Sequence, residues 1–204
     1  MIYLFGKTGV RLIREELVTI NKVYISAQSL LDDSFRLGLE IMEDGFHPDY
    51  IIGIWRGGTP VGIAVQEIMK YHGYPSDHIA IRTSSYEGIA QQSDEIRVHG
   101  LHYIIENVNA EDSLLIVDDV FDSGRSIKAV IERINDLSRR NTPETIRIAT
   151  VYYKPSKRKV DVVPDYYIHK TDDWLVFPHE LEGLTREEVA ESKPIALGDR
   201  ETKA

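Results

Sequence analysis

The sequence predicts a single α/β domain with a central, mostly parallel sheet flanked by helices. From Tyr24 onward, short apolar runs of strand length alternate with segments whose apolar residues recur at helical spacing. Two passages repeat the order of buried strand, turn and amphipathic helix. This alternation favours a parallel sheet over a helix bundle or a β-sandwich. The 204 residues, 42% of them hydrophobic, suffice for one substantial core.

The two strand–turn–helix passages define the centre of the predicted sheet. In the first, residues 50–55 are predicted as a buried strand, residues 56–58 as a turn, Thr59 as an N-cap and Pro60 as the first helical residue. In the second, residues 114–117 are predicted as the buried strand. Both helices carry apolar residues at helical spacing: Val61, Ala64, Val65 and Ile68 in the first, and Ile127, Val130, Ile131 and Ile134 in the second.

The remaining elements follow from the same two patterns. They are a helix over residues 26–44, strands over 79–82, 145–153 and 166–169, and an apolar segment over 174–178. The polar passage from Ser84 to about Gly100 is predicted as a mobile loop, because long loops in compact domains are uncommon and often act as lids. Residues 1–22 are assigned to an N-terminal extension of unclear role, residues 23–182 to the domain, and residues 183–204 to a polar C-terminal tail.

The composition argues against several classes of function. A net charge of −9 disfavours a general surface for nucleic acids or membranes, because these polyanions would be repelled. The chain has no cysteine, so it has no disulfides, thiol redox chemistry or thiolate metal sites. No segment approaches the ~18 uninterrupted apolar residues of a membrane span. We therefore expect a soluble cytoplasmic protein.

The turn of the second passage has the chemistry of an anion site. Unpaired N–H groups and the positive end of the helix dipole converge where a strand gives way to a helix, so a phosphate would sit at residues 123–126. Gly124 lets the backbone wrap closely around an anion. The hydroxyls of Ser123 and Ser126 can donate to it, and Arg125 adds positive charge.

Asp118 and Asp119 precede this turn, where carboxylates would repel a phosphate. They need another partner, and the vicinal hydroxyls of a ribose supply one. Two carboxylates can accept hydrogen bonds from a 2′,3′ diol, while Mg²⁺ bridges the point where diphosphate and hydroxyl oxygens meet. The pattern therefore indicates a ligand that carries both a phosphate and a diol.

A plainer interpretation is a solvated acidic turn in which Asp122 or Ser123 caps the helix. An isolated Asp-x-Ser-Gly would favour it, but here a buried strand, paired carboxylates, a glycine turn and an amphipathic helix coincide. The chain contains neither G-x-x-x-x-G-K-[ST] nor G-x-G-x-x-G, so a nucleotide triphosphatase or a dinucleotide-dependent dehydrogenase lacks its main support. His99 and His102 have no third ligand nearby in the sequence, and we assign them no function.

The segment from Asp118 to Ser126 resembles the signature of type I phosphoribosyltransferases, which has a hydrophobic strand, two acidic residues, two spacers and Asp-Ser-Gly-Arg-Ser. The resemblance covers most of residues 24–180 and implies a small hood subdomain built from terminal segments. It implies that Ser85 and Tyr86 begin a flexible loop over the site. The implied binding set for 5-phosphoribosyl 1-diphosphate (PRPP) is Arg56, Gly57, Gly58, Asp118, Asp119, Asp122, Ser123, Gly124, Arg125 and Ser126.

Two further segments resemble the base pocket of the 6-oxopurine branch of that family. These are Tyr153-Lys154-Pro155 and, further along the chain, Asp173-Trp174-Leu175-Val176. In this resemblance Lys154 donates to the 6-oxo group, Trp174 stacks on the ring, and the backbone around Leu175 binds the opposite edge. Taken alone, such a lysine is usually a solvated charge and such a tryptophan usually packing.

The resemblance implies a Mg²⁺-dependent enzyme of purine salvage. It would transfer the phosphoribosyl group from PRPP to hypoxanthine, guanine or xanthine, and release diphosphate and a nucleoside 5′-monophosphate. Asp122 would act as general base or proton shuttle at purine N7, or only electrostatically, and Arg56 would assist the leaving diphosphate. Asp118 and Asp119 would hold Mg²⁺, and Glu180 would help to hold a second ion. A homodimer or homotetramer is also implied.

Two alternatives stay open from the sequence. The fold also serves non-catalytic regulators that sense PRPP, although no helix-turn-helix segment precedes this domain and the charge is acidic. The second alternative is a phosphoribosyltransferase for another base. Lys154 argues against adenine, because the exocyclic amine of adenine is itself a donor and would meet the lysine donor unfavourably.

Overall fold

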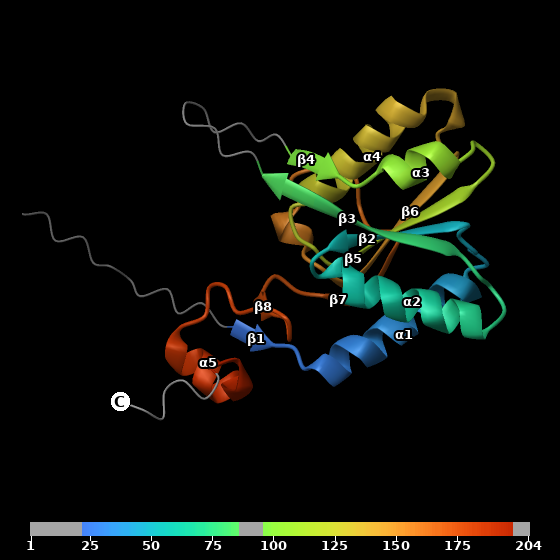
Figure 1. The fold of residues 1–204 in the computed structure, drawn as a ribbon. Helices are drawn as coiled ribbons and strands as arrows, with labels where there is room; N and C mark the ends of the chain where they lie inside the picture. The colour runs from blue at the N-terminus through green and yellow to red at the C-terminus, as the bar shows by residue number, and fades with distance from the viewer. Residues whose placement is uncertain (1–21, 86–95, 198–204) are drawn as a thin grey trace, which may run out of the picture.

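The computed structural model describes residues 22–85 and 96–197, and Figure 1 shows their arrangement. The strands are β1 (Lys22–Tyr24), β2 (Tyr50–Trp55), β3 (Asp77–Ser85), β4 (Ile96–His99), β5 (Ser113–Phe121), β6 (Thr145–Tyr153), β7 (Tyr166–Lys170) and β8 (Trp174–Val176). The helices are α1 (Ala27–Glu43), α2 (Gly58–Tyr71), α3 (His102–Asn107), α4 (Arg125–Ser138) and α5 (Arg186–Ser192), with short 3-10 turns at Arg139–Asn141, Pro155–Lys157 and Pro194–Leu197.

The central sheet has the strand order β4-β3-β2-β5-β6-β7. All neighbouring strands are parallel except β3 and β4, so the predicted central, mostly parallel sheet is confirmed. The two strand–turn–helix passages contribute β2 and β5, which lie side by side. Because parallel strands point the same way, the turns that follow β2, β5 and β6 meet at one edge of the sheet.

Helices cover both faces of this sheet, and Figure 1 shows α1 and α2 on the side opposite α3 and α4. The middle strand β5 shows how the chain serves both layers. Its buried Leu115 and Val117 join a core cluster with α1 and α2, whereas Leu114 and Ile116 join the cluster that contains α3 and α4. A strand that is buried on both faces has a continuous apolar run, which is the pattern that predicted β5.

A small second unit is built from the two ends of the described chain, as the sequence led us to expect. Strand β1 pairs in parallel with β8, and α5 lies beside them (Figure 1). Lys22 Nζ lies 2.7 Å from a carboxylate oxygen of Glu188, which ties β1 to α5. The segment predicted as a polar tail includes α5 within its described part, and the hydroxyl of Thr185 caps this helix. We call this unit, made of β1, β8, α5 and residues 177–185 that join β8 to α5, the hood.

The start of α2 differs from the sequence prediction. The helix begins at Gly58, and its N-cap is Gly57, whose backbone is already helical with φ −66° and ψ −34°. Thr59 is therefore not the cap, and its buried hydroxyl has no hydrogen-bond partner. Pro60 still fits, because the N–H groups of the first helical turn have no partner inside the helix.

Strand pairing also reaches further than predicted at two places. Strand β5 continues past Val117 and pairs with β6 as far as Phe121, so the acidic pair lies within a strand. The passage predicted as a loop from Ser84 to Gly100 has strands at both ends, because β3 and β4 pair in antiparallel fashion up to Ser85 and Ile96. Residues 86–95, which include Tyr86 of the predicted flexible loop, lie outside the described residues. No helix among the described residues is long and apolar enough to cross a membrane.

Candidate functional site

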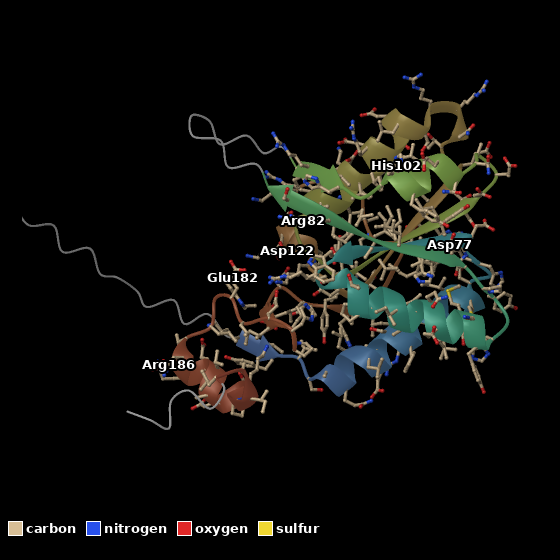
Figure 2. All side chains as sticks on the ribbon, in the orientation of Figure 1. Asp77, Arg82, His102, Asp122, Glu182 and Arg186 are labelled. Carbon is tan, nitrogen blue, oxygen red and sulfur yellow. The ribbon has the colours of Figure 1, made fainter. Side chains whose placement is uncertain are left out.

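The predicted site residues gather at the edge of the sheet where β2, β5 and β6 end. Figure 2 shows Asp122 at this edge and Glu182 on the hood beside it. The turn after β2 contributes Arg56, the turn after β5 contributes Asp122, and the residue after β6 is Lys154. These three charged side chains come from segments far apart in the sequence, and the sheet order brings them together.

The turn between β5 and α4 requires glycine at position 124. Gly124 has φ +76°, and a Cβ there would lie 2.4 Å from Cζ of Phe121 and 2.6 Å from Cγ2 of Val160. Helix α4 begins at Arg125, and its N-cap is Gly124, so neither Asp122 nor Ser123 is the N-cap. The Ser123 hydroxyl accepts a long hydrogen bond of 3.4 Å from the Arg125 N–H. The first N–H groups of a helix have no acceptor inside the helix, so the start of α4 suits an anion.

Arg125 and Ser126 form the first two residues of α4. The side chain of Arg125 lines a cavity of about 690 Å³ between α4 and β4, which also has Arg97 and Lys128 in its wall. Lys128 forms an ion pair of 2.8 Å with Asp161. Arg125 and Lys128 thus place two cationic side chains near the start of α4, and the one at Lys128 is paired with a carboxylate.

Asp118 and Asp119 lie close to the turn after β2. Asp119 is only 7% exposed, and the N–H of Asp119 donates to Oδ1 of Asp118 at 3.0 Å. Burial raises the pKa of the Asp118 carboxyl well above its usual value, and the neighbouring carboxylate of Asp119 raises it further. Two neighbouring, largely buried carboxylates repel each other, so a bound cation would stabilise their charged forms.

These carboxylates fit Mg²⁺ in the manner typical of phosphate-binding sites. Mg²⁺ is usually held by one or two carboxylates, and water and substrate phosphate complete its coordination. Among the residues that the structure describes, no group of three or more His, Asp or Glu side chains forms a complete metal site. Asp118 and Asp119 offer two carboxylates, which is the number that Mg²⁺ usually takes from a protein.

The turn after β2 packs directly against the acidic pair. A Cβ at Gly57 would lie 1.9 Å from Oδ2 of Asp119, and one at Gly58 would lie 2.4 Å from the carbonyl oxygen of Val117. Both glycines are therefore needed for this close approach. The peptide bond between Trp55 and Arg56 is cis. The half-exposed guanidinium of Arg56 lies 3.6 Å from a carboxylate oxygen of Glu182 in the hood.

Lys154 is held next to Asp122 by the backbone. Its N–H donates to the carbonyl oxygen of Phe121 at 2.9 Å, which continues the pairing of β5 with β6 by one more bond. Its Nζ lies 3.3 Å from Oδ2 of Asp122. The Lys154 side chain is 12% exposed and that of Asp122 is 52% exposed, so a mostly buried ammonium faces an accessible carboxylate.

The hood contributes the remaining predicted residues. Trp174 is 48% exposed at the start of β8, and Leu175 is buried opposite Val23 of β1. The carboxylate of Glu180 accepts a hydrogen bond of 3.2 Å from the N–H of Phe177, within its own loop. A metal-binding role for Glu180 stays a prediction.

Sequence reasoning missed three residues at this edge. His179 Nε2 lies 3.5 Å from Oδ2 of Asp119, and Glu182 reaches Arg56 from the hood. Arg82, labelled in Figure 2, is the last residue of β3 that pairs with β2, and its partner is Trp55, the residue before Arg56. No local pattern marked His179 or Glu182, because their contacts depend on how the hood sits over the sheet.

The fold is that of an α/β protein with a mostly parallel six-stranded sheet between helices and a small second sheet from the terminal segments. Residues 24–183 match the family described as phosphoribosyl transferase domain, and the chain belongs to that family.

Relatives and solved structures agree with this membership. A hypoxanthine-guanine phosphoribosyltransferase of Streptococcus mutans is 28% identical over 159 residues, which are 77% of this chain and 82% of that protein. The crystal structure of a purine phosphoribosyltransferase from Pyrococcus horikoshii has a TM-score of 0.62 at 28% identity, and covers 80% of this chain and 97% of that one. A hypothetical protein from Neisseria gonorrhoeae with bound ppGpp has a TM-score of 0.67 at 18% identity over 87% of this chain and 98% of its own, a likeness of fold alone.

Proposed function

We propose that this protein transfers the 5-phosphoribosyl group from PRPP to a 6-oxopurine base, namely hypoxanthine, guanine or xanthine. The products are the nucleoside 5′-monophosphate and diphosphate. The observation that carries the proposal is the pair formed by Lys154 Nζ and Asp122 Oδ2, which are 3.3 Å apart next to the start of α4. The names of the relatives from S. mutans and P. horikoshii support a purine as the acceptor.

The Lys154–Asp122 pair matches one edge of a 6-oxopurine. O6 and N7 lie side by side on that edge, so two neighbouring side-chain groups can bind them together. The Lys154 ammonium donates to O6, and the Asp122 carboxylate accepts from N7–H of the free base. Adenine has a donor where O6 stands, so it would face the Lys154 donor unfavourably. Trp174 offers an exposed ring for stacking in the hood.

The reaction breaks one bond and forms another at C1 of the ribose. Purine N9 attacks C1, the diphosphate leaves with the electron pair of the C1–O bond, and the proton on N7 passes to Asp122. Arg56 stabilises the charge on the departing diphosphate. Asp118 and Asp119 accept hydrogen bonds from the ribose diol and place negative charge near the sugar, which gains positive charge in the transition state. The N–H groups at the start of α4 hold the 5-phosphate.

Mg²⁺ is the proposed cofactor, with Asp118 and Asp119 as its protein ligands. When bound, it neutralises charge on the diphosphate oxygens.

The decisive experiment follows nucleotide formation from PRPP and Mg²⁺ with each of hypoxanthine, guanine, xanthine and adenine. Turnover with at least one 6-oxopurine and none with adenine is the expected result. Binding of PRPP without turnover of any base would instead favour the PRPP-sensing regulator. Turnover of adenine alone, or of a pyrimidine, would assign the protein to another base.

The role of Lys154 has its own test. Lys154→Ala should raise the KM for the 6-oxopurine by about tenfold to a hundredfold, because the charge-assisted hydrogen bond to O6 is lost. The KM for PRPP should change much less. Lys157→Ala, in the exposed turn that follows, is the matched control and should leave both values as they are. Equal small effects from the two variants would remove Lys154 from the base site.

A further inference from the structure

We propose that His179 is a positioning residue that fixes the Asp119 carboxylate for the ribose of PRPP. The inference rests on the proposed function and adds a residue to its PRPP site. His179 lies in the loop after β8, and its Nε2 is 3.5 Å from Oδ2 of Asp119 at the sheet edge. The contact crosses from the hood to the central sheet, so it links the unit that carries Trp174 to the unit that carries the acidic pair.

The carboxylate of Asp119 has a neighbour on each of two sides, namely the turn after β2 and the imidazole of His179. On one side its Oδ2 occupies the space that a side chain at position 57 would need, so it forms the wall against which the turn after β2 packs. On another side it faces the imidazole of His179. In the proposed arrangement Nε2 of His179 carries its proton toward this buried carboxylate and restricts its rotation. A fixed orientation of the carboxylate lowers the cost of binding a diol.

The His179 ring is itself held by packing. It stacks on the buried ring of Phe177, with centroids 5.8 Å apart and ring planes 15° apart. Phe177 contacts Tyr152 of β6 edge-to-face at 5.7 Å. The next residue along the chain from Phe177 is Pro178, and the ammonium of Lys193 donates to the carbonyl oxygen of Phe177 at 2.5 Å. The imidazole therefore has a defined place although its side chain is 28% exposed.

The packing continues through the sheet to α1. Tyr152 stacks on His169 of β7 at 5.0 Å, and His169 Nε2 lies 2.8 Å from a carboxylate oxygen of the buried Asp33 in α1. An unbroken series of contacts thus runs from α1 through β7 and β6 to the hood and ends at the Asp119 carboxylate. Such rigid support is what a positioning side chain needs in order to act on its neighbour.

Three substitutions at position 179 separate the donor from the ring. His179→Gln keeps an N–H donor at similar reach but removes the ring, His179→Phe keeps the stacked ring but has no donor, and His179→Ala lacks both. The Kd of PRPP with Mg²⁺ is measured for each by isothermal titration calorimetry. We expect Phe and Ala to weaken PRPP binding by about tenfold, and Gln to stay within about threefold of the wild type.

Kinetics supply the second readout. The KM for PRPP should rise in the Phe and Ala variants while the KM for the base changes little, a split that general destabilisation of the hood would not give. His102→Ala is the matched control, since His102 is an exposed histidine on α3 that pairs with Glu106. It should bind PRPP as the wild type does.

The outcomes separate this inference from the proposed function. Failure of the wild type to bind PRPP overturns the proposed function and the inference with it. A wild type that binds PRPP, with all three variants binding equally well, overturns the inference alone. A Gln variant as weak as the Phe variant also overturns it, because the donor would then not be what matters.

Discussion

The two strand–turn–helix passages have the same order of elements but build their turns in different ways. Between β2 and α2 the N-cap Gly57 is already helical, at φ −66°. Between β5 and α4 the N-cap Gly124 is left-handed, at φ +76°. Neither α2 nor α4 has a side-chain cap, whereas Ser26 caps α1 and Thr185 caps α5. Both α2 and α4 start at the sheet edge where the candidate site lies, and α3 also lacks a side-chain cap.

The same strand–turn–helix order therefore serves close backbone packing in one turn and the placement of reactive side chains in the other. The turn after β2 packs closely on β5, because Gly57 and Gly58 have no side chains to keep the backbone away from Asp119 and Val117. The turn after β5 gives chemistry, because it presents the accessible carboxylate of Asp122 beside the buried ammonium of Lys154. Substitution of the Asp122 side chain should therefore act mainly on turnover, whereas substitution of the glycines in either turn should act mainly on packing.

The largest expected effect is on catalysis, from Asp122→Asn. Loss of the proton acceptor for purine N7 should lower kcat by at least about 100-fold, while the Kd of PRPP changes by less than about threefold. Steady-state kinetics and calorimetry measure the two values. Asp136→Asn, on the exposed side of α4, is the control. A kcat within a few-fold of the wild type would show that the turn after β5 does not carry the proton transfer.

The next effect is on stability, from Gly124→Ala. The left-handed backbone and the clash with Phe121 and Val160 should together lower the free energy of unfolding by about 3 kcal/mol. Gly45→Ala is the matched control, since Gly45 has the same φ of +76° but nothing within 4 Å of its added Cβ. Denaturant unfolding should give a loss of about 1 kcal/mol there. Equal losses at the two sites would mean that strain alone, and not the packing of this turn, selects glycine.

A smaller loss is expected from Gly58→Ala in the turn after β2. The added Cβ would lie 2.4 Å from the Val117 carbonyl oxygen, and this backbone atom has little room to move, so we expect a loss of about 2 kcal/mol. Gly62→Ala in the same helix meets only ordinary contact at 3.6 Å and should be neutral or stabilising, because alanine favours helix. Thermal unfolding of both variants tests whether glycine at position 58 is needed for the packing of this turn on β5. A neutral Gly58→Ala would show that it is not.

The smallest effect concerns the ion pair between Lys128 and Asp161 near the start of α4. The hydrogen bond from Lys128 lowers the pKa of the Asp161 carboxyl. The pair therefore stabilises the fold above the usual carboxyl pKa of about 4, and this contribution is lost as the pH falls through the lowered pKa. Asp161→Asn should lower the Tm slightly at about pH 6 and not at about pH 2. Glu132→Gln, which removes a more distant carboxylate at 3.9 Å from Lys128, should change the Tm less.

Much of the fold followed from local pattern. The limits of β2 and β6 were predicted residue for residue, because a buried strand has a continuous apolar run bounded by turn residues. The start of α2 was predicted wrongly because Thr59-Pro60 has the local sequence of a helix start, while packing against Asp119 lets the helix begin earlier. The extension of β5 was missed because its last pairs depend on β6, which is distant in the sequence.

By itself, the sequence determined the chemistry of each turn: the paired carboxylates at Asp118 and Asp119, the glycine before α4, and the α/β alternation around them. These are contiguous patterns, and their physical consequences act over a few residues. Only the tertiary structure decided which groups meet across the chain. The approach of Lys154 to Asp122 needs β6 beside β5, and that of His179 to Asp119 needs the hood over the sheet edge. Such contacts depend on strand order and packing, which no local pattern records.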